Sequence, residues 1–131
     1  MANEFASNIP IYLQIMNDIK LKIVSGIWEP GQRLQSVRDL AVEFSVNPNT
    51  MQRALAELER DELLYTERTS GRYVSQDEKK ISRARDEMAE EYTENYFNSM
   101  KKLGYKEDKI VYFVSDKLKL KKEENQDEQS Y

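Results

Sequence analysis

The chain has 131 residues, 39% of them hydrophobic, and a formal net charge of −4 at pH 7. It contains no Cys and no His, which excludes disulfides, thiol chemistry and the usual zinc and copper sites. The acidic balance argues against a protein that coats nucleic acid non-specifically, whereas specific binding depends on where the basic residues lie. The N-terminus lacks the basic start of a signal peptide and no apolar run reaches membrane-spanning length, so we expect a soluble, cytoplasmic protein.

Residues 1–8 are expected to form a flexible arm, and a first helix is predicted to begin near Pro10. Gly26 is the expected end of this helix, followed by a turn at residues 29–31 and a short extended piece at residues 32–34. Isoleucines that repeat every four residues predict one buried side for the helix: Ile11, Ile15, Ile19 and Ile23.

Two helices joined by a tight turn are predicted next. Ser36 is a good N-cap for the first of them, and Asp39 stands where a capping-box acid belongs. Asn47 is a second N-cap, and Pro48 suits the first helical position because no amide hydrogen is missed there. The pair therefore has the form of a helix-turn-helix.

The outward positions at the start of the second helix carry amides, a hydroxyl and a guanidinium, and none is acidic: Asn47, Asn49, Thr50, Gln52 and Arg53. These groups can bond base edges and phosphates, and a helix N-terminus adds free N–H groups that favour an anion. A solvated polar face with good caps is the alternative interpretation of these residues alone.

A β-hairpin is predicted after the helices, with strands at residues 63–66 and 72–75. Its tip carries side chains that could contact phosphate or enter a minor groove: Arg68, Thr69, Ser70, Gly71 and Arg72. An ordinary surface turn would have the same composition. The order of helix, short strand, two helices and hairpin predicts a winged helix-turn-helix domain over residues 9–76, in a chain that is mainly α with a small β-hairpin.

From residue 77 the sequence is highly charged and predicts a helical dimerisation segment over residues 77–118. One apolar stripe runs along a long helix that ends at Gly104: Ile81, Ala84, Met88, Tyr92, Tyr96, Met100 and Leu103. It could pack on its own domain, but a second copy is the favoured partner. Residues 110–114 suit a strand or a short helix, and helix is the choice because no strand nearby could pair with them. Residues 119–131 are expected to be a disordered charged tail.

Residues 9–76 resemble the DNA-binding domain of the GntR family of bacterial transcription regulators, and the short C-terminal part resembles the YtrA-like subfamily. The resemblance rests on these residues: Pro10, Ile11, Tyr12, Ile23, Gly26, Pro30, Gly31, Leu34, residues 36–41, Val46, residues 47–50, Ala54, Leu55, Glu57, Leu58, Leu63 and residues 71–74.

The resemblance implies a helical dimerisation segment and a link to transporter genes. It also implies a phosphate or groove contact for Arg38 and a wing glycine at Gly71. Three residues depart from the family pattern. Gln35 replaces a Pro, Pro48 stands where other branches have a basic residue, and Glu62 replaces a common Gly, at a cost in stability if φ is positive there.

The sequence thus predicts a regulator, in the simplest case a repressor, that binds a palindromic operator in double-stranded DNA as a homodimer. The alternative is a winged-helix module that binds protein. No catalytic set and no cofactor site are expected. A small-molecule effector could bind between Tyr92, Tyr96 and Phe97, but simple packing of these aromatics is favoured. The candidate DNA contacts are Ser36, Arg38, Asn47, Asn49, Thr50, Gln52, Arg53, Arg68, Thr69, Ser70, Gly71 and Arg72.

Overall fold

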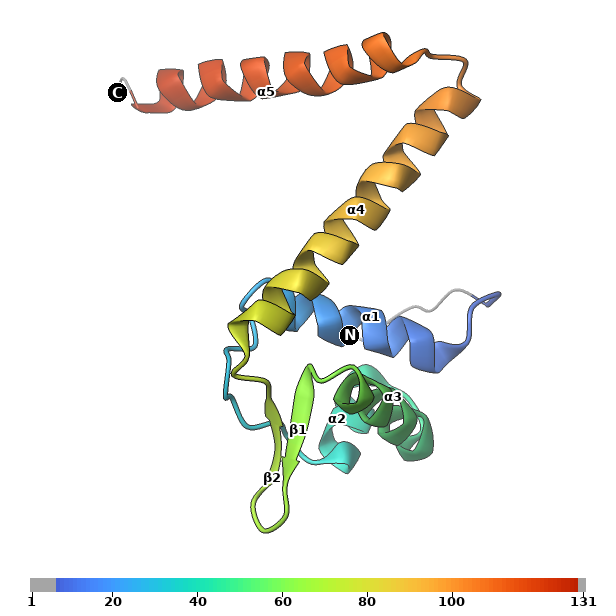
Figure 1. Cartoon of the computed structure of the whole chain (residues 1–131), viewed down its shortest axis with the longest axis vertical. Coiled ribbons are helices and arrows are strands. Elements are labelled where there is room, and N and C mark those ends of the chain that lie inside the picture. The colour runs from blue at the N-terminus through green and yellow to red at the C-terminus, as the bar shows by residue number, and fades with distance from the viewer. Residues whose placement is uncertain (1–6, 130–131) are drawn as a thin grey trace. The chain divides into compact units, whose positions relative to one another are not determined.

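The four-residue repeat of isoleucines forms helix α1, and four further helices and one hairpin follow it along the described chain (Figure 1). The computed structural model describes residues 7–129. Its elements divide into two compact units, the first ending at Asp86 and the second beginning at Glu87. The helices are α1 Ile11–Val24, α2 Val37–Phe44, α3 Pro48–Arg60, α4 Glu78–Lys102 and α5 Glu107–Gln129, and the strands are β1 Leu64–Glu67 and β2 Gly71–Val74. The predicted fold class is confirmed.

The core of the first unit lies where α1 and α2 both pack against α3. Ile15 and Ile19 of α1 are fully buried, and so are Met51 and Leu58 of α3. Phe44 closes the core from α2 with only 2% of its surface exposed. Because the apolar residues of each helix recur at helical spacing, burying them leaves the opposite face of α3 to solvent.

Both predicted caps are present. The Ser36 hydroxyl accepts a hydrogen bond from the Asp39 amide at 3.1 Å, and the Asn47 side-chain oxygen accepts one from the Asn49 amide at 2.8 Å. Between the two helices, Ser45 turns the chain with a left-handed φ of 57°. The tight turn therefore separates two independently capped helices.

The hairpin is a two-stranded sheet on which the extended piece before α2 also rests. β1 and β2 pair antiparallel, with Leu64 opposite Val74, and each strand is shifted by one residue from its predicted bounds. Arg33 forms an isolated bridge with Tyr73, and the Leu34 amide donates to the Arg72 carbonyl at 2.8 Å. The extended piece before α2 thus pairs with β2 and fixes the wing to the helix-turn-helix.

A loop after α1 carries the single tryptophan of the chain. The Trp28 amide donates to the Lys22 carbonyl at 2.9 Å, folding the loop back on the end of α1, and the side chain is half-buried. Gly26 permits this reversal with a φ of 83°. Trp28 therefore belongs to the first unit.

The first turns of α4 dock on the first unit. Ile81 is 4% exposed, and the Arg85 side chain donates from Nε to the Val24 carbonyl at 2.8 Å. Lys80 pairs with Glu62, their charged atoms lying 2.6 Å apart. Ile81 therefore packs within the first unit, and little of its side chain is left exposed for a second copy.

α5 begins at Glu107 and continues to Gln129. The choice of helix for residues 110–114 is confirmed, and the same helix continues through residues 119–129, where the sequence predicts a disordered tail. Lys and Glu are good helix formers and can extend a helix that has no core of its own. Residues 130–131 and most of the predicted arm, residues 1–6, lie outside the described residues. None of the helices in residues 7–129 is long and apolar enough to cross a membrane.

Candidate nucleic-acid interface

The outward face of α3 carries the side chains that the sequence selects. Asn47, Asn49, Gln52 and Arg53 are exposed, while Thr50 is half-buried. The first turn of α3 contains no acidic residue. The N-terminus of α3 therefore presents hydrogen-bonding groups and the positive end of the helix dipole, which together suit an anion such as phosphate.

Arg53 is held by an aromatic ring from another helix. Its guanidinium carbon lies 3.7 Å from the centre of the Tyr12 ring of α1, within the range of a cation–π contact. The sequence motif around Tyr12 gives no hint of this contact, because the two residues lie far apart in the chain. The close packing of α1 on α3 brings them together.

α2 contributes Arg38 and Ser36. Arg38 is exposed and has no ion pair among the described residues, so its guanidinium is available for an external group. The Ser36 oxygen accepts the Asp39 amide hydrogen, which leaves the hydroxyl proton free to be donated to a phosphate oxygen. Ser36 can therefore cap α2 and donate to an external group at the same time.

Some side chains of the wing are exposed, whereas others already have a partner within the first unit. Arg68 and Thr69 are exposed at the tip. The Ser70 hydroxyl accepts a hydrogen bond from the Tyr73 hydroxyl at 2.8 Å. Arg72 turns inward, where its Nη2 lies 3.4 Å from a Glu59 carboxylate oxygen and its side chain is only 17% exposed. Arg72 is therefore better placed to join the wing to α3 than to reach a ligand.

A further arginine of the wing was missed by the sequence analysis. Arg33 is exposed, and its side chain crosses Gly71, where an added Cβ would lie 3.2 Å from the arginine Nε. Gly71 has a φ of 130°, so it provides both the conformation and the space. The sequence already predicts an extended piece at residues 32–34. Because such a piece can pair with the hairpin, its central arginine was a candidate for the wing.

The second unit exposes much apolar surface. From α4, Tyr92 is 49% and Leu103 71% exposed, whereas Met88 is 7% exposed and Ala84 of the first unit is half-buried. Tyr96 and Met100 are half-buried. α5 adds exposed residues that the sequence analysis did not select: Val111, Tyr112, Phe113, Val114, Leu118 and Leu120. The exposed part of the predicted stripe thus begins at Tyr92 and continues onto α5.

Two open grooves lie between α4 and α5 in this unit. One, of about 450 Å³, is lined by Tyr92, Phe97 and Val114 among others. The other, of about 630 Å³, includes Met100 and Leu120. The turn between the helices is fixed by the Tyr96 hydroxyl, which donates to the carbonyl of the fully buried Ile110 at 3.3 Å. After this turn the ribbons of α4 and α5 diverge (Figure 1).

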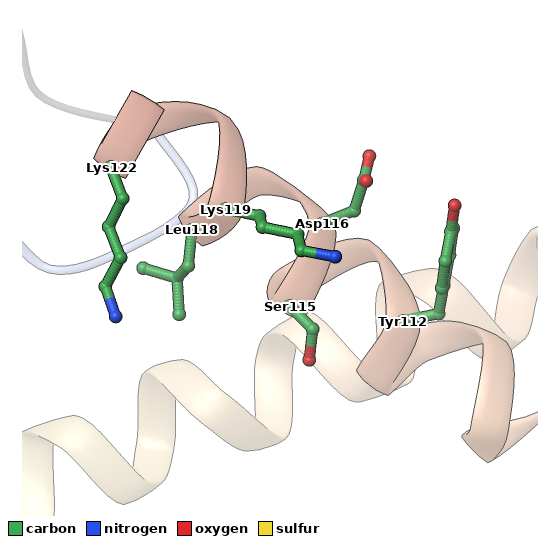
Figure 2. A pocket seen from close by; sticks show the side chains of 6 residues that line it. All are labelled: Tyr112, Ser115, Asp116, Leu118, Lys119 and Lys122. Carbon is green, nitrogen blue, oxygen red and sulfur yellow. The ribbon is translucent and has the colours of Figure 1, made fainter. Parts of the chain in front are cut away.

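A third depression, unlike the two grooves, is lined by residues of α5 alone. Figure 2 shows its six lining side chains spread along a single helix, α5. They comprise two lysines, one carboxylate, one hydroxyl, one aromatic and one leucine: Tyr112, Ser115, Asp116, Leu118, Lys119 and Lys122. Because all the described lining residues come from one helix, the hollow is a surface feature and offers no enclosure for a metabolite.

Comparison with known proteins gives consistent matches. A family model described as bacterial regulatory proteins, gntR family, matches residues 11–74. The chain is 35% identical over 111 residues to the uncharacterized HTH-type transcriptional regulator YhcF of Bacillus subtilis, covering 85% of this chain and 92% of that protein. It is 44% identical over 73 residues to the HTH-type transcriptional repressor YtrA of the same organism, which is 56% of each chain.

The solved structures agree. A GntR family transcriptional regulator from Listeria monocytogenes is 43% identical, with a TM-score of 0.78 over 86% of this chain and 98% of that one. The DNA-binding domain of AraR in complex with operator ORX1 is 26% identical, with a TM-score of 0.50 over 57% of this chain and 93% of that one. The similarity to the operator-bound domain covers about the extent of the first unit.

Proposed function

The chain belongs to the GntR family of bacterial transcription regulators, and from that premise we propose that it represses transcription by binding a palindromic operator as a homodimer. The observation that carries the proposal is the outward N-terminal face of α3, which has amide, hydroxyl and guanidinium groups and no acid in its first turn. The fixed wing beside it supplies further cations. Such a protein acts where the bacterial chromosome is, in the cytoplasm.

Recognition would follow from the exposed groups. α3 enters the major groove, where Asn49 and Gln52 offer amides that can bond adenine in pairs and Thr50 offers a hydroxyl and a methyl group. Arg38 bonds the DNA backbone and sets the register of the helix. In the wing, Arg33 and Arg68 reach the neighbouring phosphates, because both are exposed and neither has an ion pair among the described residues.

Dimerisation would use the second unit. Both α4 and α5 expose apolar residues, and the two grooves that these helices line share Tyr96 and Val114 and have no occupant from the described chain. Single exposed apolar residues are common, but a contiguous patch of this kind marks an interaction site. A two-fold dimer would place two recognition helices on half-sites about one helical turn, roughly 34 Å, apart.

Repression is the expected outcome of operator binding because a bound dimer blocks polymerase. The similarity to YtrA, which is named a transcriptional repressor, supports this direction. The two grooves of the second unit are open and apolar, so filling them with a second copy is preferred to binding a small effector.

In vitro selection from a random duplex library tests the proposal most directly. The full chain should enrich an inverted repeat, and anisotropy with that duplex should show binding about a thousandfold tighter than to a scrambled one, weakening with salt. The Thr50→Ala, Gln52→Ala double variant should lose the preference while its melting temperature stays near that of the wild type. Failure to enrich any sequence would contradict the proposal and favour a protein-binding module.

A further inference from the structure

Arg53 occupies a special position on α3. It is exposed on the outward face, yet its guanidinium lies over an aromatic ring of α1, with 3.7 Å between its central carbon and the ring centre of Tyr12. Among the described residues it has no ion pair and no hydrogen bond. Its N–H groups therefore remain available although the group itself is held in place.

Stacking has a specific effect on an arginine. A free side chain of this length samples many rotamers, and ordering it reduces the affinity gained from each contact. A ring under the planar face of the guanidinium restricts these rotamers, while the N–H donors lie around the edge of the plane and can still bond a phosphate in pairs. A stacked arginine is thus preorganised for an anion.

The direction of the side chain indicates which part of DNA it would meet. A helix in a groove points the centre of its outward face at base edges, and its flanks face the two backbones that border the groove. The contact with Tyr12 holds Arg53 at the flank of α3 on which α1 packs. A phosphate is the group that lies beside such a flank.

We infer that Tyr12 is a positioning residue that holds Arg53 ready to bind a phosphate of the operator backbone, an inference that rests on the proposed function. Tyr12 is half-buried and belongs to the first turns of α1, so its ring is itself fixed by the fold. The contact makes α1 a contributor to DNA affinity without any DNA contact of its own being required.

A double-mutant cycle on the full chain tests the inference. Arg53→Ala should weaken binding to the selected operator and to a scrambled duplex alike and should lower the salt slope by about one. Tyr12→Leu should weaken binding about two- to fivefold when Arg53 is present and should have no effect in the Arg53→Ala background. Tyr12→Phe retains the ring and should bind as the wild type does.

Two further measurements separate positioning from a purely structural role. In NMR spectra of the free protein, the Arg53 Nε–H resonance should be shifted upfield by the ring current, and this shift should disappear in Tyr12→Leu and persist in Tyr12→Phe. Melting curves of all variants show whether they are folded at the temperature of the binding assay.

The outcomes are distinct. Equal losses from Tyr12→Leu with and without Arg53, or an unshifted Arg53 resonance in the wild type, would overturn the positioning role. A wild-type chain that binds its operator selectively while Arg53→Ala binds equally well would overturn the inference and leave the proposed function intact. A wild-type chain that selects no sequence would overturn both.

Discussion

Between residues 7 and 129, two residues other than glycine adopt a left-handed backbone at helix ends, Ser45 with φ 57° and Glu62 with φ 63°. Ser45 makes the tight turn between α2 and α3. Glu62 follows the end of α3, where the sequence analysis noted that relatives often have Gly. A side chain in this conformation costs roughly 1 kcal/mol. The Glu62–Lys80 pair offsets little of this, because both side chains are more than a third exposed and such pairs contribute about 0–1 kcal/mol.

Substitution at position 62 should reveal the conformational cost. Glu62→Gly and Glu62→Ala both remove the pair with Lys80, but only glycine adopts the positive φ without strain. We expect the glycine variant to be more stable than the alanine variant by about 1 kcal/mol in free energy of unfolding. Chemical denaturation at one fixed protein concentration measures the difference. Equal stabilities would mean that the backbone relaxes to a negative φ in the alanine variant.

Asn47 combines a cap with an exposed place on the proposed DNA face, and these roles can be separated. Asn47→Asp keeps an oxygen acceptor for the Asn49 amide, so its stability should match or exceed that of the wild type. Its carboxylate should nevertheless repel phosphate and reduce operator affinity. Asn47→Ala should instead lose about 1 kcal/mol of stability. Melting curves and anisotropy measure the two effects, and undiminished affinity of the Asp variant would place Asn47 away from DNA.

Among the secondary-structure elements, the wing contains arginines with different roles, and a contact with a residue distant in the sequence decides which role each has. Arg72 pairs with Glu59 and is largely buried, whereas Arg33 and Arg68 are exposed. The Nε of Arg72 is buried and has no hydrogen-bond partner among the described residues. The wing thus has one arginine that joins it to α3 and two that face outward.

Alanine substitutions in the wing should therefore fall into two groups. Arg33→Ala and Arg68→Ala should each lower the slope of log affinity against log salt by about one, with little change in stability. Arg72→Ala should lower the melting temperature and leave the slope unchanged. Anisotropy titrations over several salt concentrations, with melting curves alongside, provide the measurement. A lower slope for Arg72→Ala would show that it leaves Glu59 when DNA binds.

Whether the sequence predicts a feature depends on how far apart in the chain the residues that form it lie. The caps at Ser36 and Asn47 were predictable because each side chain and its amide partner are within three residues. The bridge between Arg33 and Tyr73 and the Arg72–Glu59 pair were not, since they depend on residues that only the tertiary fold brings together. The Tyr12–Arg53 contact was missed for the same reason.

The difference between the predicted tail and α5 has another origin. A charged segment with almost no apolar content predicts that no core forms, and disorder is therefore the expectation for residues 119–131. The same lysines and glutamates favour helix locally, so α5 continues to Gln129. The stripe on α4 was predicted as a whole, yet Ile81 and Met88 are buried within the chain, because periodicity defines a face without naming what covers it.

At the scale of the whole molecule, the proposed dimer depends on exposed apolar residues of the second unit. Tyr92→Glu with Val114→Glu places two charges in one groove, at residues that are 49% and 45% exposed. The variant should sediment as a folded monomer and should bind the operator about a hundredfold or more weakly, because the two half-sites are no longer engaged together.

Asn98→Glu is the matched control for this variant. Asn98 is exposed on α4 and does not line either groove, so the control should remain dimeric and bind normally. A dimer that persists in the double variant would place the interface on another surface. Met88 is unsuitable for such a test, because its side chain is buried and a charge there would disturb folding.

The position of Trp28 gives the protein a natural reporter. It is the only tryptophan in the chain, and its loop is bonded to the end of α1 in the first unit. Fluorescence excited at the red edge of tryptophan absorption therefore follows the DNA-binding unit alone, while circular dichroism follows all five helices. Where the two signals separate during denaturation, the difference belongs to the second unit, so the stability of each half can be measured in the intact, unlabelled chain.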